Sequence, residues 1–204
     1  MKEAYIWILK KTKLKKLAGI IKIIFDVFFW ATLVLGAISF LFFIATFFVP
    51  ENIFVVSGIR EGWSISMIGG IMRYNIDPDL YSNINLKHFL KAILPAVTVI
   101  SLMLMIIAHN LKLVLKTIVK DRPFEKSNSK RLLVIGIVLI AGSIILNITE
   151  GITALAIINT LEIKNVDVVF TVDGAMLLTG ILVIILAGIF RYGSYLQDEY
   201  DTTL

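Results

Sequence analysis

The sequence predicts an all-α membrane protein, a four-helix transmembrane bundle with a small extracytoplasmic β-containing cap. Four long apolar runs carry this prediction, because none of them contains Asp, Glu, Lys or Arg. They cover residues 27–49, 92–111, 132–149 and 174–190. Their lengths of 23, 20, 18 and 17 residues are close to the length of about 20 residues with which a helix crosses a bilayer. Residues 1–204 therefore form a single integral membrane domain.

The distribution of charge between the segments outside the runs predicts their sides. Fifteen of the 20 Lys and Arg residues lie in residues 1–26, 112–131 and 191–204, against seven acidic residues. The segments 50–91 and 150–173 hold five basic and eight acidic residues. Since cytoplasmic loops carry an excess of Lys and Arg, the first group, with both termini, is expected in the cytoplasm. The lipid bilayer is the first expected partner, and anionic lipid explains the basic charge without direct nucleic-acid binding.

The segment before the first run, residues 1–22, is predicted to be an amphipathic helix on the membrane surface. Apolar residues recur there at helical spacing among lysines such as Lys10, Lys11 and Lys15. That pattern is typical of an interfacial helix. An anchor that fixes topology and a docking surface for a partner are both consistent with it.

The two outer segments are predicted to supply the strands of the cap. Ile53–Val56 is β-prone, Trp63–Met67 alternates apolar and polar residues, and a third candidate is Val166–Val172. Such runs between turn residues favour strands. Trp63 and Arg73 are the candidate functional residues of the cap. Covering the helix ends and binding a ligand both remain open as its role.

The last two runs raise questions of length and packing. The third continues beyond Glu150 without charge to Leu161, so its helix either protrudes or breaks after Gly151. In the fourth, Gly180 and Gly188 share one helical face and predict close packing against a neighbouring helix.

The sequence offers little catalytic chemistry, so we expect no enzyme and no cofactor. Cysteine is absent, and the two histidines have no metal-ligand spacing. The polar residues within the runs are mild, Asn147 being the most polar, whereas transporters carry ionisable or broken-helix features at membrane depth. Asn147 is expected to form an interhelical hydrogen bond, and a homo-oligomer is a further open possibility.

Two cytoplasmic segments carry the remaining signals. Pro123 is expected to begin the helix that leads into the third run, with Phe124 against apolar neighbours. The tail places Tyr192, Tyr195, Leu196 and Tyr200 near helical spacing, beside the acidic residues Asp198, Glu199 and Asp201. An acidic tail below a basic loop predicts ion pairs that dock the two segments together.

These segments resemble the bacterial four-span membrane-protein family known as domain of unknown function 2975. Its inner loop carries Pro-Phe-x-x-x-Asn, and its tail carries Phe-x-x-Gly-x-x-Leu-x-x-Glu-x-Asp-x-Thr followed by a hydrophobic residue. The matching residues here are Pro123, Phe124, Asn128, Phe190, Gly193, Leu196, Glu199, Asp201, Thr203 and Leu204. The resemblance implies the bacterial plasma membrane and no established reaction or ligand. It also implies a cytoplasmic helix-turn-helix transcription regulator as a partner.

The functional hypothesis is therefore a non-enzymatic membrane regulator or sensor that presents its inner face to such a regulator. The alternative is an immunity or transport-associated membrane protein that protects against membrane-active peptides through its outer loops. The first depends on the inner segments, and the second on the surroundings of Trp63 and Arg73.

Overall fold

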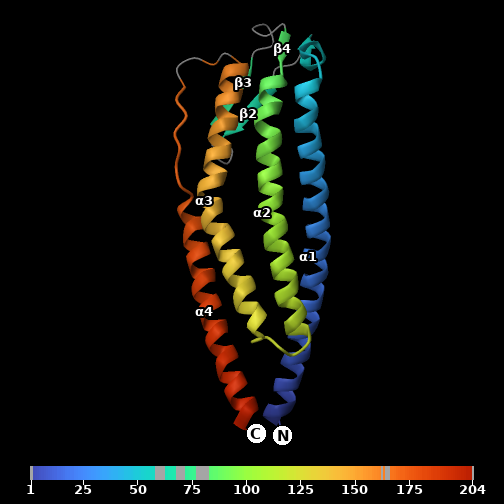
Figure 1. Cartoon of the computed structure of the whole chain (residues 1–204), viewed down its shortest axis with the longest axis vertical. Coiled ribbons are helices and arrows are strands. Elements are labelled where there is room, and N and C mark those ends of the chain that lie inside the picture. Colours follow the sequence, from blue (N-terminus) through green and yellow to red (C-terminus); the bar gives the residue numbers. More distant parts are fainter. Residues whose placement is uncertain are drawn as a thin grey trace. The chain divides into compact units, whose positions relative to one another are not determined.

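Four long helices dominate the computed structural model (Figure 1). Their bounds are Lys2–Phe48 (α1), Lys87–Val119 (α2), Lys126–Thr160 (α3) and Gly174–Thr203 (α4). The structure describes residues 2–57, 63–67, 72–76, 83–161, 163 and 166–203, and it describes side chains within 12–56, 85–161, 163, 166–200 and at 202. Each predicted apolar run lies inside one of these helices, and all four helices are long and apolar enough to cross a membrane.

The chain divides into two compact units, each of which is described by itself. Unit 1 comprises Met1–Ile38, Val97–Asn147 and Thr171–Leu204, and unit 2 comprises Ser39–Ala96 and Ile148–Phe170. Unit 1 therefore contains parts of α1, α2 and α3 together with all of α4. Unit 2 contains the remaining helix ends and the strands.

The helix ends follow local side-chain chemistry. The Asn85 Oδ1 atom accepts a hydrogen bond of 3.0 Å from the backbone N–H of Lys87, the first residue of α2. Asp173 is the N-cap of α4, because its Oδ1 atom accepts a hydrogen bond of 3.0 Å from the backbone N–H of Met176, the third residue of the helix. Pro50 lies two residues after the end of α1, where its ring prevents the helix from continuing.

The apolar core of unit 1 joins α2, α3 and α4. Its buried members are Val114, Leu132, Ile135 and Ala187, and partly buried side chains including Phe190 pack around them. Most other apolar side chains of the four helices are exposed, for example Leu41 at 65% and Ile137 at 52%. A helix that exposes apolar side chains on most of its faces is suited to a lipid environment.

Two glycines bring the backbones of α3 and α4 together. A Cβ atom at Gly180 would lie 2.9 Å from the Gly136 carbonyl oxygen and 2.7 Å from the Ile140 Cγ1 atom. The predicted close packing at Gly180 is therefore correct. At Gly188 it is wrong, because a Cβ atom there would meet nothing within 4 Å.

Within unit 1, α1 and α2 meet through charged and aromatic side chains. The Lys112 Nζ atom lies 2.7 Å from the Asp26 Oδ1 atom and 4.7 Å from the centre of the Phe29 ring. The Phe29 ring also contacts His109, with 5.6 Å between the ring centres. Lys15 forms a further ion pair with Asp121 in the loop after α2.

Four short strands follow α1 in unit 2. Val55–Ser57 (β1) pairs antiparallel with Asn83–Asn85 (β4), and Trp63–Met67 (β2) pairs antiparallel with Met72–Ile76 (β3). The bounds of β2 are those predicted from its alternating pattern. The β-prone run Ile53–Val56 is divided instead, since the single-turn 3-10 helix Glu51–Phe54 (η1) takes its first half.

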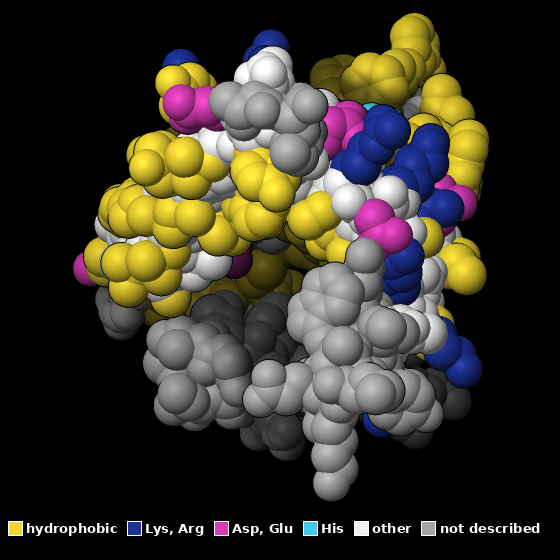
Figure 2. All heavy atoms as spheres, turned by 90° about the horizontal axis from the view of Figure 1, so that it is seen from below, with side chains coloured by type: hydrophobic (Ala, Val, Ile, Leu, Met, Phe, Trp, Pro, Cys, Tyr) yellow, Lys and Arg dark blue, Asp and Glu magenta, His cyan; other side chains and the backbone are white. Residues whose placement is uncertain are grey.

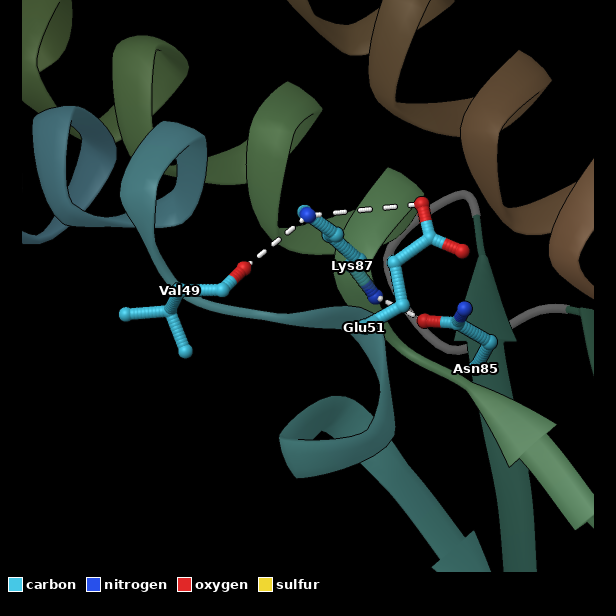
Figure 3. A network of polar contacts seen from close by, with 4 residues as sticks. All are labelled: Val49, Glu51, Asn85 and Lys87. Carbon is cyan, nitrogen blue, oxygen red and sulfur yellow. Dashed lines mark hydrogen bonds and ion pairs between the residues drawn. The ribbon is translucent and has the colours of Figure 1, made fainter.

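Lys87 connects the end of α1 to the start of α2 in unit 2 (Figure 3). Its Nζ atom donates a hydrogen bond of 3.0 Å to the Val49 carbonyl oxygen and lies 4.0 Å from the Glu51 Oε1 atom. Only 9% of Lys87 is exposed. The carbonyl groups at a helix C-terminus lack partners within the helix, so the ammonium group satisfies one of them and complements the helix dipole.

The prediction of a strand at Val166–Val172 is wrong. The segment has no strand in the structure, and it makes side-chain contacts to α3 instead. Within unit 2 the Phe170 ring lies directly against Gly151, and within unit 1 the Thr171 hydroxyl donates to the Asn147 Oδ1 atom at 3.0 Å. High β-propensity does not form a strand without a partner to accept its backbone hydrogen bonds.

Two expectations about helix length have different outcomes. The helix α3 continues past Gly151 to Thr160, so the predicted alternative of a break after Gly151 is wrong. The helix α1 runs without interruption from the predicted surface segment 1–22 into the first apolar run. The location of residues 1–22 at the membrane surface stays a prediction.

Candidate functional site

The site predicted at the α2–α3 loop begins with a well-formed helix terminus. The Arg122 backbone N–H bonds to the Thr117 carbonyl oxygen at 2.9 Å, and the Asp121 N–H bonds to the Ile118 carbonyl oxygen at 3.1 Å. This pair of hydrogen bonds is the Schellman motif, which requires a residue with positive φ after the helix. Asp121 supplies it with a φ of 63°. The chain therefore leaves α2 in a fixed direction.

Pro123 belongs to a turn and does not begin α3. The Glu125 N–H lies 3.3 Å from the Arg122 carbonyl oxygen, which closes a turn with Pro123 at its second position, and α3 begins at Lys126. The expectation that Pro123 starts the helix is thus wrong by three residues. The reason is that the fixed φ of proline suits the second position of a β-turn as well as a helix start.

Asn128 is the centre of the hydrogen-bond network in this loop. Its side chain is 0% exposed, and its Nδ2 atom donates to the Thr117 Oγ1 atom at 2.5 Å and to the Pro123 carbonyl oxygen at 2.8 Å. Its Oδ1 atom accepts a hydrogen bond of 2.9 Å from Arg131, which also donates to the Leu113 carbonyl oxygen. A buried amide with partners at both ends fixes α2, the loop and α3 relative to each other.

Phe124 extends from the loop onto α4. Its ring centre lies 5.4 Å from that of Phe190, and a Cβ atom at Gly193 would lie 2.7 Å from the Phe124 Cδ1 atom. The glycine therefore leaves room for the ring. The structure thus brings together Phe124, Phe190 and Gly193, which belong to separate parts of the predicted motif.

The remaining motif residues of the tail lie on the last turns of α4. Leu196 is 46% exposed, and its neighbours Tyr192, Tyr195 and Tyr200 are between 62% and 66% exposed. Asp198 forms an ion pair of 2.5 Å with Lys126, so the expected contact between the acidic tail and the basic loop exists at this pair. The Glu199 carbonyl oxygen accepts a hydrogen bond from Thr202. The side chain of Asp201, and those of Thr203 and Leu204, lie outside the described residues.

The two candidates of the predicted cap occupy the two-stranded β2–β3 ladder. Trp63 pairs with Ile76, and Arg73 pairs with Ser66. The side chains of both candidates lie outside the described residues.

The interactions of several residues were not predicted. Thr117 and Arg131 complete the Asn128 network, and Ser129 donates a hydrogen bond of 2.8 Å to the Ala187 carbonyl oxygen of α4. In the sequence these residues stand out only as polar residues near a charge-free run, and that pattern is too common to identify a contact. Asn147, expected to bridge helices, donates to the Ser143 carbonyl oxygen of its own helix and accepts from Thr171.

The described residues contain no group of three or more His, Asp or Glu side chains that could hold a metal ion. What the loop and tail do provide is a rigid base, built on Asn128 and Phe124, and an exposed apolar face on α4. Such an arrangement can bind another molecule through its surface.

The fold defines a class first: this is a multi-pass membrane protein with four apolar helices. The chain belongs to the family described as protein of unknown function DUF2975, whose model matches residues 77–204. That match covers the loop and tail motifs and begins after the β2–β3 ladder. Neither the curated proteins nor the solved structures gave a match to this chain.

Proposed function

We propose that this protein is a non-enzymatic regulator or sensor of the bacterial plasma membrane that binds a cytoplasmic helix-turn-helix transcription regulator. In this proposal both termini, the α2–α3 loop and the end of α4 face the cytoplasm. The excess of Lys and Arg in the segments 1–26, 112–131 and 191–204 supports that orientation. The strands β1–β4 then belong to an extracytoplasmic cap.

One observation carries the proposal: an exposed apolar stripe on α4 beyond its charge-free run. The stripe consists of Tyr192, Tyr195, Leu196 and Tyr200, which recur at intervals of three, one and four residues and so share one helical face. Their exposures of 65%, 62%, 46% and 66% place all four side chains at the surface of the helix. Tyrosine is enriched at protein interfaces, and an apolar helix face is a common recognition element.

The acidic residues beside the stripe support a partner with a basic surface. Asp198 and Glu199 lie between its members in the sequence. A DNA-binding regulator has a basic surface, which such carboxylates would attract. A regulator held there would be kept from DNA, and a change in the membrane domain would alter its release.

The test is recovery of the partner from membranes. The variant L196A/Y200A truncates the stripe, and we expect it to lower recovery of a cytoplasmic regulator by about tenfold or more, as loss of interface anchors commonly does. The matched control is Leu178→Ala, which truncates a leucine that is 58% exposed near the other end of α4. A transcript profile of the deletion strain should show a defined set of changed genes.

A different outcome would favour the alternative function. If no partner is recovered and no transcripts change, while sensitivity to membrane-active peptides rises, the protein is an immunity or transport-associated factor. Substitutions at Trp63 and Arg73 should then have the larger effect.

The orientation has a separate test, which the absence of cysteine makes clean. Single cysteines at Ser64 and Ser127 are labelled in intact cells with an impermeant thiol reagent. The proposed orientation predicts labelling at Ser64 alone, and labelling at Ser127 alone would reverse it.

A further inference from the structure

A basic groove lies between the first turns of α3 and the last turns of α4, within unit 1. It has a volume of about 530 Å³, and its lining includes Lys126, Lys130, Leu133, Arg191, Tyr195 and Asp198. Three cations and one carboxylate leave a charge of about +2 in a concave site of ligand-binding size. Figure 2, which views the molecule from below, shows Lys and Arg side chains gathered along one side, with Asp and Glu side chains among them.

On both helices the groove lies at the boundary between charged residues and an apolar run. Lys130 comes two residues before the apolar run 132–149, and Arg191 directly follows the run 174–190. If these runs span the bilayer, the two cations lie at the depth of the lipid headgroups.

The same face of α3 continues from cations to exposed apolar side chains. Lys126, Lys130, Leu133 and Ile137 follow at intervals of four, three and four residues, the spacing of one helical face. Leu133 is 42% exposed and Ile137 is 52% exposed. A molecule with an anionic head and an apolar chain would match this face, with its head at the cations and its chain along the apolar side chains.

The ion pairing inside the groove leaves two cations for a ligand. Asp198 pairs with Lys126, whose side chain is 78% exposed, so this contact is a weak surface pair. Among the described residues, neither Lys130 nor Arg191 has a hydrogen bond or ion pair from its side chain. A guanidinium and an ammonium group together are a common means of binding a phosphate.

We propose that this groove binds the phosphate of an anionic phospholipid from the inner leaflet, with an acyl chain along Leu133 and Ile137. Basic pockets between membrane helices on the cytoplasmic side hold anionic headgroups in this way. The groove shares Tyr195 and Asp198 with the surface proposed for the regulator, and its place in the inner leaflet rests on the proposed orientation. Lipid binding can still be tested separately, because it is measured on the purified protein without a partner.

The experiment measures bound lipid by native mass spectrometry of the detergent-purified full chain. Phosphatidylglycerol and phosphatidylcholine with the same acyl chains are titrated separately. Because each cation near an anionic headgroup changes affinity by about fivefold, we expect a preference for phosphatidylglycerol of about tenfold or more. Equal retention of the two lipids would overturn the proposal.

The variant K130Q/R191Q removes the two cations, and it should lower phosphatidylglycerol affinity by about 25-fold. The control K116Q/K120Q removes two exposed lysines from the end of α2, at the same end of unit 1 and outside the groove lining. It should change the affinity by less than about twofold. An equal loss of phosphatidylglycerol affinity in both variants would mean that the lipid is attracted by the overall positive charge and that the groove is not a specific site.

A gain of binding separates the proposal from unfolding of the variants. Asp198→Asn removes the carboxylate of the groove and releases Lys126, so it should raise phosphatidylglycerol affinity by about threefold. Glycerol 3-phosphate at millimolar concentration tests the source of the phosphate. If it displaces the lipid completely, or if D198N lowers lipid binding, a lipid site is refuted.

Discussion

The α3–α4 and α1–α2 contacts of unit 1 join helices by different means. Between α3 and α4, Gly136 and Gly180 bring the backbones close enough that an added methyl group would overlap. Between α1 and α2, the side chains of Asp26, Phe29 and Lys112 make an ion pair and a cation–π contact. The first contact depends on shape at the level of the backbone, while the second depends on charge at the ends of flexible side chains.

The difference shows which sequence changes each pair of helices can tolerate. A lysine can move its ammonium group by rotation of its side chain, but two helix backbones cannot separate without loss of their other contacts. We therefore expect α3–α4 to respond sharply to added volume, and α1–α2 to respond weakly to changes of charge.

The largest effect is expected for Gly180→Ala. The new Cβ atom would meet the Gly136 carbonyl oxygen at 2.9 Å, and overpacking against backbone should lower the free energy of unfolding by about 3 kcal/mol. Gly188→Ala is the matched control on the same helix. It meets open space and should raise stability by up to about 1 kcal/mol, because alanine favours helix. Unfolding in mixed micelles measures both, and equal changes would refute the backbone contact.

An intermediate effect is expected for Asn128→Ala, which tests the α2–α3 connection below this contact. It leaves the buried Thr117 hydroxyl and the partly buried Pro123 carbonyl and Arg131 side chain without their amide partner, and should cost about 2 kcal/mol of unfolding free energy. Asn110→Ala serves as control, because the Asn110 side chain donates to a carbonyl of its own helix. Similar losses in the two variants would show that the network adds no stability.

The smallest effect is expected at the α1–α2 ion pair. Asp26→Asn keeps the shape of the side chain and removes its charge, and the Lys112–Asp26 attraction is partly screened because the Asp26 side chain is 49% exposed. The change in thermal midpoint should be smaller than for either variant above and should diminish with added salt. A loss as large as that of Gly180→Ala would contradict the contrast between the two helix pairs.

The sequence was most informative where a property is summed over many residues. Four charge-free runs predicted four helices, since insertion into a membrane depends on the average character of about 20 residues. It was less informative about pairing. Gly180 was identified as a packing residue, but nothing in the sequence pointed to Gly136 as its partner, and Gly188 has the same local pattern with open space around it.

The site shows the same limit. The motif named Phe124, Phe190 and Gly193, and the structure adds that the glycine accommodates the ring. Thr117 and Arg131 were not predicted, because a hydrogen-bond partner is set by geometry in three dimensions. The segment 166–172 failed for a related reason: its β-branched residues satisfy the local preference for a strand, but it lies against α3.

The Schellman turn at Asp121 and the buried amide of Asn128 have a mechanical consequence. Together they make the connection between α2 and α3 rigid, because the hydrogen bonds of the loop oppose a change in its backbone conformation. An axial shift or rotation of α3 would therefore be transmitted to the end of α2, and through the Phe124 ring to α4 at Gly193. The ends of α2, α3 and α4 at this loop would then move together as one unit.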